Sequence, residues 1–419
     1  MPRAMTVARR PRPADRWLLP AGVSPDAGIL LRARGIRAFG DGFVSVLLPL
    51  HLAALGFSAF EIGAIATATL LGSAALTLVV GFVAYRLGRR LLLLRASLLM
   101  VATGVGFAFV HDFWPLLVVA FVGTLNSSSG DVSVFLPTEQ ALLPQTTPDA
   151  QRTALFARYS LIGSLVAAVG ALAAALPKAL TDRFGWPLAR GFDAMFLLYA
   201  LLGLAASLLY RGLSPRIEPA ERVRAPLTTA RPIVLKLAAL FSIDSFGGGF
   251  VVQSLLAFWL FQRFGFSAAV AGAIFFWTGV LAAFSALAAA RIARRIGLLN
   301  TAVFTHLPAN AFLILTPFMP SAPLAVACLL ARSALSQMDV PVRNSYVMAV
   351  VSPAERPAAA SVTAVPRSLA AATSPLLAGW LLGLSPFGWP LVIGGALKGL
   401  YDVLLLLTFR HVRPPEEGG

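Results

Sequence analysis

Uninterrupted apolar stretches of about 20 residues recur along almost the whole chain, and they restrict its fold more than any other feature. A helix of about 20 apolar residues spans the hydrocarbon core of a bilayer. Of the 419 residues, 58% are hydrophobic and 12% are charged, whereas soluble domains carry about 25% charged residues. The sequence therefore predicts an all-α polytopic membrane protein rather than a soluble fold.

We place twelve membrane-spanning helices along the chain, in two pseudo-symmetric bundles of six. The predicted spans cover residues 36–55, 60–85, 91–110, 115–143, 153–176, 192–210, 233–261, 268–290, 299–318, 323–351, 358–384 and 390–409. This divides the chain into a tail (1–35), a first bundle (36–211), a central loop (212–232), a second bundle (233–410) and a short second tail (411–419).

The net charge of +16 collects in the first tail, the central loop and the short loops that follow the second and eighth spans. Basic loops stay on the cytoplasmic side of a membrane, so we expect both termini and the central loop to be cytoplasmic. The expected location is the inner (plasma) membrane. No soluble basic domain is present, which argues against nucleic-acid binding. Cys328 is the one cysteine, so neither a disulfide framework nor a thiolate metal site is expected.

An internal repeat relates the two halves. Pro137 and Glu139 correspond to Pro341 and Arg343, 204 residues later. The turn sequence Gly-Phe-Ser-Ala occurs at 56–59 and again at 265–268. Two halves of the same orientation form the parallel repeat that is typical of one transporter architecture.

The loop after the second span carries the sharpest family motif. Residues 81–90 read Gly-Phe-Val-Ala-Tyr-Arg-Leu-Gly-Arg-Arg, which resembles the Gly-x-x-x-Asp-Arg-x-Gly-Arg-Arg pattern of the major facilitator superfamily. Tyr85 replaces the usual aspartate, which helps to hold the halves together in that family. The resemblance implies the twelve-helix fold and alternating access. The proline-containing signature of drug antiporters in the fifth span is not present.

Ionisable residues inside the predicted spans are costly and normally face a cavity or a partner. A buried carboxylate can exchange protons when its surroundings alternate, so we expect proton coupling at one or more of the acids. The candidates are Asp131, Asp41, Asp244 and Glu139. The alternatives are a permanent salt bridge for Asp131 and a structural pair between Asp41 and Arg37.

Substrate binding is expected between the halves, near the middle of the membrane. Arg332 lies about nine residues into the tenth span, and its guanidinium would suit an anionic group. The alternative is an ion pair with Asp339 or Asp131. The other candidates are polar residues in the matching segments of both halves, namely Asn126, Ser129, Gln253, Ser336, Gln337 and Asp339.

A gate is expected where Glu139 and Arg343 occupy equivalent positions of the repeat, because an ion pair between them would close one side. The alternative is that both extend to the membrane interface. Further candidates for gating and ion pairing are Arg158, Arg367, Arg86 and Arg90.

These features predict a secondary transporter that moves a small organic solute, couples to protons and exports its substrate, the direction resting on the family resemblance. The alternative is an importer or facilitator of an organic anion held by Arg332. A membrane-embedded enzyme or a solute receptor is the rival from another class, but no catalytic constellation is visible. The chain has no phosphate-binding Gly-x-x-x-x-Gly-Lys motif. We expect no cofactor, no metal and a monomer in the lipid bilayer.

Overall fold

The structure, a computed structural model, describes residues 23–128, 134–148, 151–214, 231–340, 343, 346–347, 351 and 355–410, and it is helical in almost all of them. The helices of the first half are α2 (Pro25–Ala54), α3 (Ala59–Leu87), α4 (Arg89–Phe109), α5 (Phe113–Val122), α6 (Phe135–Leu142), α7 (Arg152–Leu172), α8 (Leu176–Phe184) and α9 (Leu188–Arg211). Those of the second half are α10 (Arg231–Gly249), α11 (Gln253–Phe264), α12 (Ala268–Ile296), α13 (Leu298–Leu315), α14 (Ala322–Leu335), α16 (Arg356–Leu384) and α17 (Trp389–Phe409).

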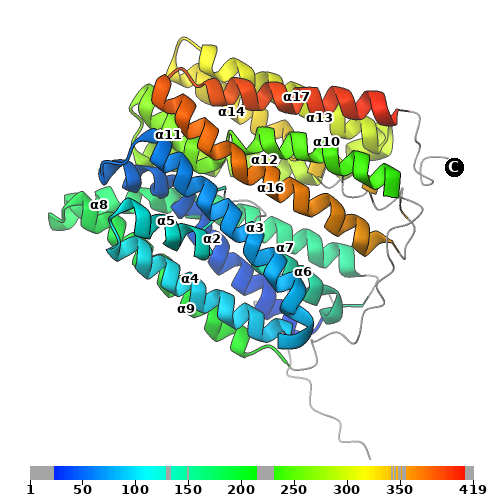
Figure 1. Cartoon of the computed structure of the whole chain (residues 1–419), viewed down its shortest axis with the longest axis horizontal. Helices are drawn as coiled ribbons and strands as arrows, with labels where there is room; N and C mark the ends of the chain where they lie inside the picture. Colours follow the sequence, from blue (N-terminus) through cyan, green and yellow to red (C-terminus); the bar gives the residue numbers. More distant parts are fainter. Residues whose placement is uncertain are drawn as a thin grey trace, which may run out of the picture.

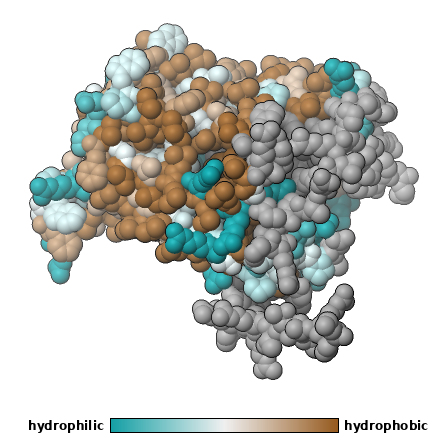
Figure 2. Space-filling view, turned by 60° about the horizontal axis from the view of Figure 1, so that its bottom comes forward, coloured by the Kyte–Doolittle hydropathy of each residue, from teal (hydrophilic) through white to brown (hydrophobic). Residues whose placement is uncertain are grey.

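Nine stretches in the described part of the chain are long and apolar enough to cross a membrane, and α5 and α14 are shorter apolar helices. The all-helical membrane fold is therefore confirmed, while the count of twelve spans stays a prediction. Apolar residues cover much of the face shown in Figure 2. Exposed apolar side chains such as Trp277 and Phe284 fit a surface that lies against lipid tails rather than water.

The first helix begins before the predicted first span. Helix α2 begins at Pro25, eleven residues before the start of the predicted first span. Proline is favoured at the first position of a helix, where its missing N–H is not needed. As a result Arg34, assigned to the tail, is buried inside the bundle, as is Arg37.

The internal repeat is confirmed in local structure. Ser58 and Ser267 cap the N-termini of α3 and α12, each accepting a bond at 3.3 Å from the backbone N–H three residues later. Both helices have 29 residues and end at a glycine with positive φ, Gly88 at 72° and Gly297 at 85°. Only glycine adopts this conformation without strain. A serine cap at the N-terminus and a glycine at the C-terminus therefore delimit equivalent helices in the two halves.

The two halves lie one above the other in Figure 1, with α3 of the first half beside α16 of the second. A second contact joins α7 to α12. At the end opposite the termini the backbones nearly touch. A Cβ on Gly63 would lie 2.7 Å from the Pro375 carbonyl oxygen, and one on Gly272 would lie 2.3 Å from that of Ala171. Small residues permit such approach between membrane helices, and they close the protein at this end.

Replacing Gly379 by alanine is expected to open this closed end. Its Cβ would lie 2.5 Å from the Ala59 carbonyl oxygen, so α3 and α16 must separate. Spin labels at Phe60→Cys and Leu384→Cys, in a Cys328→Ser background, should report longer distances. Gly383→Ala, one turn later on the same helix, is the matched control, because its Cβ would meet only the Ala59 Cβ at 3.7 Å. Equal distances in both variants would contradict the expectation.

Candidate functional site

Helices from both halves are interrupted where they meet. Helix α5 ends at Val122, and residues 123–128 form a non-helical segment. In the second half α10 ends at Gly249 and α11 begins at Gln253. The Ser254 N–H donates to the Ser127 carbonyl oxygen at 3.1 Å, which joins the two interruptions directly. We call residues 123–128 and 250–254 the central junction.

Several polar groups of the segment 123–128 are bonded to neighbouring helices or within the segment. The Thr124 N–H donates to Thr103 Oγ1 at 3.2 Å, and its carbonyl oxygen accepts from the Tyr199 hydroxyl at 3.2 Å. Asn126 Oδ1 accepts from the Ser128 N–H at 3.0 Å. Non-helical backbone at membrane depth is stable only inside protein or along a cavity. The predicted candidates Asn126 and Gln253 thus lie on facing sides of one buried junction.

The three glycines that follow Asp244 permit close packing of α10 against other helices, and α10 also ends at the last of them. A Cβ on Gly247 would lie 2.9 Å from the Gly394 carbonyl oxygen, and one on Gly249 would lie 2.0 Å from Ser374 Oγ. Helix α10 therefore packs closely against α17 and α16. It also ends immediately afterwards, which exposes the first N–H groups of α11 for bonding across the junction.

Glu139 is the centre of a buried cluster in the first half. It binds the guanidinium of Arg37 and accepts bonds from the hydroxyls of Tyr159 and Tyr210. Arg37 Nε donates to the Tyr210 hydroxyl at 3.1 Å, and its guanidinium lies 4.0 Å from the centre of the Phe135 ring. The expected pairing of Glu139 with Arg343 across the halves is not present here, because a partner from α2 satisfies the carboxylate.

Asp41 is buried, with 7% of its surface exposed. No hydrogen bond or ion pair joins it to another residue that the structure describes. The structural pair with Arg37 is therefore not formed, because Arg37 binds Glu139 instead. A buried carboxylate without a hydrogen bond or ion pair is costly when ionised, and the charges of Arg37 and Arg34 offset part of that cost.

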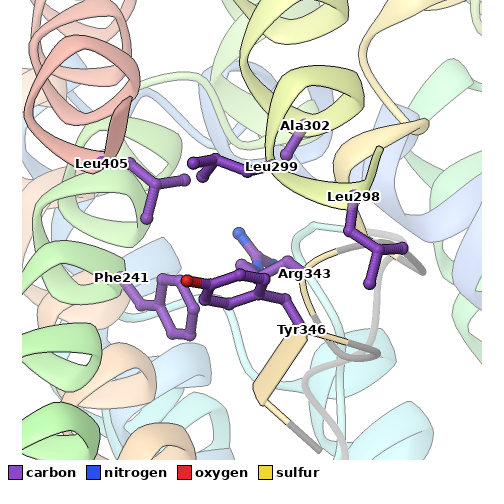
Figure 3. Close-up of a pocket in the computed structure, with 7 residues that line it drawn as sticks. All are labelled: Phe241, Leu298, Leu299, Ala302, Arg343, Tyr346 and Leu405. Atoms are coloured by element: carbon purple, nitrogen blue, oxygen red, sulfur yellow. The ribbon is translucent and has the colours of Figure 1, made fainter. Parts of the chain in front are cut away.

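Asp244 is the centre of a second cluster, in the second half. Its carboxylate accepts from Lys398 Nζ at 2.5 Å and from Arg343 Nη1 at 3.0 Å. Asp339 binds the same Arg343 nitrogen at 3.2 Å. Arg343 also borders a cavity of about 10 Å³ beside Phe241 and Tyr346, as Figure 3 shows. A cavity of about this size is at the lower limit for holding one water.

Three buried or half-buried arginines are neither hydrogen bonded to nor ion paired with any described residue. They are Arg34, Arg158 and Arg332, each with a buried nitrogen that has no hydrogen-bond partner. Arg34 lies over the Tyr159 ring at 5.4 Å. Arg332 is on the last turn of α14, and the pair with Asp339 considered above is not formed, because Asp339 binds Arg343. Asp41 is the one buried acid with no such partner in the same part of the chain.

The other candidates are more dispersed. Arg367 donates to Ser245 at 3.3 Å, and Arg90 donates to the Arg211 carbonyl oxygen at 2.5 Å within its own half. Ser336 is half-buried and Gln337 is exposed, just beyond the end of α14. Asp131, Ser129 and the side chain of Arg86 lie outside the described residues. Among the described residues, no cluster of three His, Cys, Asp or Glu side chains could hold a metal.

Sequence reasoning missed several members of the second cluster. Lys398, Asp402, His306 and Asn310 lie on α17 and α13 and form a buried polar network with Asp244. Each is an isolated polar residue in an apolar stretch, and their spacing along the chain gives no sign that they meet. The available signal was the cost of burying Lys398 and Asp402 within a predicted span.

Comparison with known proteins gives the family. The family model of the Major Facilitator Superfamily matches residues 32–338. An uncharacterized membrane protein of Saccharomyces cerevisiae is 24% identical over 425 residues, covering 93% of this chain and 95% of its own. The uncharacterized MFS-type transporter YhjO of Bacillus subtilis is 28% identical over 162 residues, covering 39% of this chain and 38% of its own.

Solved transporter structures share the fold at low sequence identity. The nucleoside transporter NupG has a TM-score of 0.66 at 14% identity, with 92% of this chain and 100% of that chain covered. A bacterial homologue of the human lysosomal transporter Spinster, inward-facing and unoccupied, has a TM-score of 0.70 at 13% identity, with 96% and 98% covered. The human organic anion transporter MFSD10 has a TM-score of 0.63 at 18% identity, with 91% and 99% covered. The chain belongs to the major facilitator superfamily and is a multi-pass membrane transporter, not an enzyme.

Proposed function

We propose that the protein is a proton-coupled secondary transporter of a small organic anion, whose negative group binds Arg332. The observation that carries this proposal is the half-buried guanidinium of Arg332, which no described residue pairs with. An unpaired cation at membrane depth is costly, and a carboxylate or phosphate on the substrate would remove that cost with bidentate hydrogen bonds.

The balance of unpaired charge supports an anion over a cation. Arg34, Arg158 and Arg332 form no hydrogen bond or ion pair with an acid of the described chain, although the charge of Asp244 acts on Arg332 and the charges of Arg34 and Asp41 act on each other. Among the buried acids of the same residues, Asp41 alone lacks such a direct bond. An interior with excess positive charge attracts anions and repels cations. The shared fold with an organic anion transporter is consistent with this substrate class.

Asp41 is our proposed proton carrier in the first half, and Asp131 stays a candidate. Because a proton and an anion entering together balance each other's charge, the arrangement favours cotransport of the two. Under an inwardly directed proton gradient this means import, rather than the export expected from family resemblance. Each chain contains both halves of the alternating-access unit, so we propose that a monomer is sufficient.

The orientation follows from the loops. We propose that both termini are cytoplasmic, since the basic residues gather at that end of the bundle. The end that is closed by Gly63 and Gly272 would then face outward, as expected of an inward-facing conformation.

The test uses purified protein in liposomes that contain a pH-sensitive dye, with an inwardly directed proton gradient. Carboxylic acids that are fully ionised at the assay pH are added in matched pairs with their primary amides, which have nearly the same shape but no charge. The proposal expects acidification by some acids and by none of the amides, relative to protein-free liposomes. Equal responses to both members of each pair, or none to any acid, would show it to be wrong.

Replacing Asp41 by asparagine is expected to reduce this proton movement to the level of protein-free liposomes, because asparagine has no proton to exchange. The neutral side chain also costs less to bury, so the variant should fold at least as stably. Asp112→Asn, which changes an exposed residue that precedes α5, is the control and should transport as the wild type does. Proton movement by Asp41→Asn at the wild-type rate would assign the proton to another residue.

A further inference from the structure

A buried histidine binds two partners in the second half. His306, on α13, is 3% exposed, and its Nδ1 lies 2.8 Å from Asp402 Oδ1. Asn310, one turn later, donates to the other oxygen of Asp402 at 2.9 Å. Asn310 Nδ2 also lies 3.2 Å from His306 Nδ1, but its shorter bond is to Asp402. Because a carboxylate only accepts hydrogen bonds, the neutral imidazole carries its proton on Nδ1. Nε2 is then the position at which a second proton can bind.

That nitrogen faces the cluster around Asp244. His306 Nε2 lies 4.0 Å from Asp244 Oδ1, the same oxygen that accepts from Lys398 at 2.5 Å. The other carboxylate oxygen of Asp244 binds Arg343 at 3.0 Å. A proton on Nε2 would therefore place a second cation beside an oxygen that Lys398 already occupies.

The charged and titratable groups beside His306 come from α17 and from Asp244 of α10. Tyr401 lies edge-on to its ring, with centroids 6.2 Å apart. The three cations Lys398, Arg343 and Arg367 match the three acids Asp244, Asp339 and Asp402, and Arg332 on α14 is a fourth cation whose charge acts on Asp244. When His306 is neutral, the network therefore already has one more positive charge than it has acids. One added proton raises that excess to two, and an excess of positive charge attracts an anion.

Lys398 is the cation of this network that is positioned to present the excess positive charge to an anion. It comes from α17 and also contacts the Asp244 carbonyl oxygen at 3.5 Å. Its Nζ lies 3.8 Å from the position of a Cβ on Gly248, immediately before the central junction. With 11% of its side chain exposed, it is the most accessible member of its ion pair.

We propose that His306 is a proton-binding site, and that its occupation releases Lys398 from Asp244 to bind the substrate anion. The proton binds Nε2, the new N–H donates to Asp244 Oδ1, and the ammonium of Lys398 moves toward the junction. The anion part rests on the proposed function. Coupling is reciprocal, so the proton strengthens anion binding and the anion strengthens proton binding by the same factor.

The experiment uses full-length protein in lipid nanodiscs with ¹⁵N-labelled histidine and lysine side chains, followed by NMR from about pH 5 to pH 8, where histidines change charge. His306→Gln, His51→Gln and Lys398→Arg assign the signals, and Lys178 and Lys236 are the other lysines of the chain. No substrate is needed. A failure of the anion hypothesis therefore leaves this result interpretable.

The wild type should show His306 gaining a second proton and the Lys398 signal shifting with the same midpoint. Asp402→Asn should move that midpoint down by about one pH unit or more, because a stabilising carboxylate is lost. His306→Gln should remove the Lys398 transition, whereas His51→Gln, which changes a buried histidine of the other half, should retain it. The proposal is wrong if His306 keeps one protonation state throughout, or if Lys398 shifts equally in His306→Gln.

Discussion

Replacing Arg332 by methionine is expected to raise the Kd of the transported anion at least about 30-fold, because loss of one partner of a buried charge pair costs about 2 kcal/mol or more. Methionine keeps the length and the apolar stem but removes the charge. Since the guanidinium is unpaired without substrate, its removal should not destabilise the protein. The initial rate of anion uptake into liposomes, measured at several concentrations, gives the change.

Two variants separate charge from geometry at this position. Arg332→Lys keeps the charge but not the bidentate fork, so it should recover only part of the uptake. Arg263→Met removes an exposed arginine from the last turn of α11 and should transport normally. Normal uptake by Arg332→Met would exclude Arg332 as the anion site.

Glu139→Gln is expected to lower the free energy of unfolding by about 3 kcal/mol, the cost of leaving a buried cation without its counter-charge. The cation is Arg37, whose guanidinium is 2% exposed. The two tyrosine hydroxyls donate to different oxygens of Glu139, and glutamine has one acceptor oxygen, so it can still accept from only one of them. The loss therefore reports on the charge and on one hydrogen bond. Unfolding by SDS in mixed micelles provides the measurement.

The double variant Arg37→Met/Glu139→Gln should recover more than half of that loss, because it removes both charges. The control is Asp182→Asn, which breaks the exposed pair between Lys178 and Asp182 on α8. Exposed pairs contribute about 1 kcal/mol or less, so this change should be small. If the effects of the two buried substitutions were simply additive, Arg37 and Glu139 would not depend on each other.

The fold could be predicted from the sequence because each of its signals is local. An apolar stretch of about 20 residues needs no long-range information to predict a membrane helix. The repeated Gly-Phe-Ser-Ala sequence predicted matching turns, and Gly56 and Gly265 both have positive φ, 88° and 64°. The helix ends beside the polar stretches were not predicted, because the spans 115–143 and 323–351 were drawn through them, whereas α5 ends at Val122 and α14 at Leu335.

The pairing of charges could not be predicted, because it depends on how distant helices rotate and tilt. Glu139 binds Arg37, 102 residues away, rather than the symmetric Arg343. His306 binds Asp402, 96 residues away. The sequence shows that each is costly to bury, but not which partner removes the cost.

The depth of Arg34 was underestimated for a different reason. Basic residues before an apolar stretch normally mark the cytoplasmic end of a span. Here α2 begins at Pro25, so more than two helical turns precede Arg34. The guanidinium of Arg34 lies over the Tyr159 ring instead of at the membrane surface.

The most direct test of the anion site is the Kd of a transported carboxylate, measured by calorimetry with purified wild type and with Arg332→Met. We expect binding of the carboxylate by the wild type, no measurable binding of the matched amide, and a Kd at least about 30-fold higher in Arg332→Met. Equal Kd values for wild type and Arg332→Met, or equal binding of acid and amide, would contradict it.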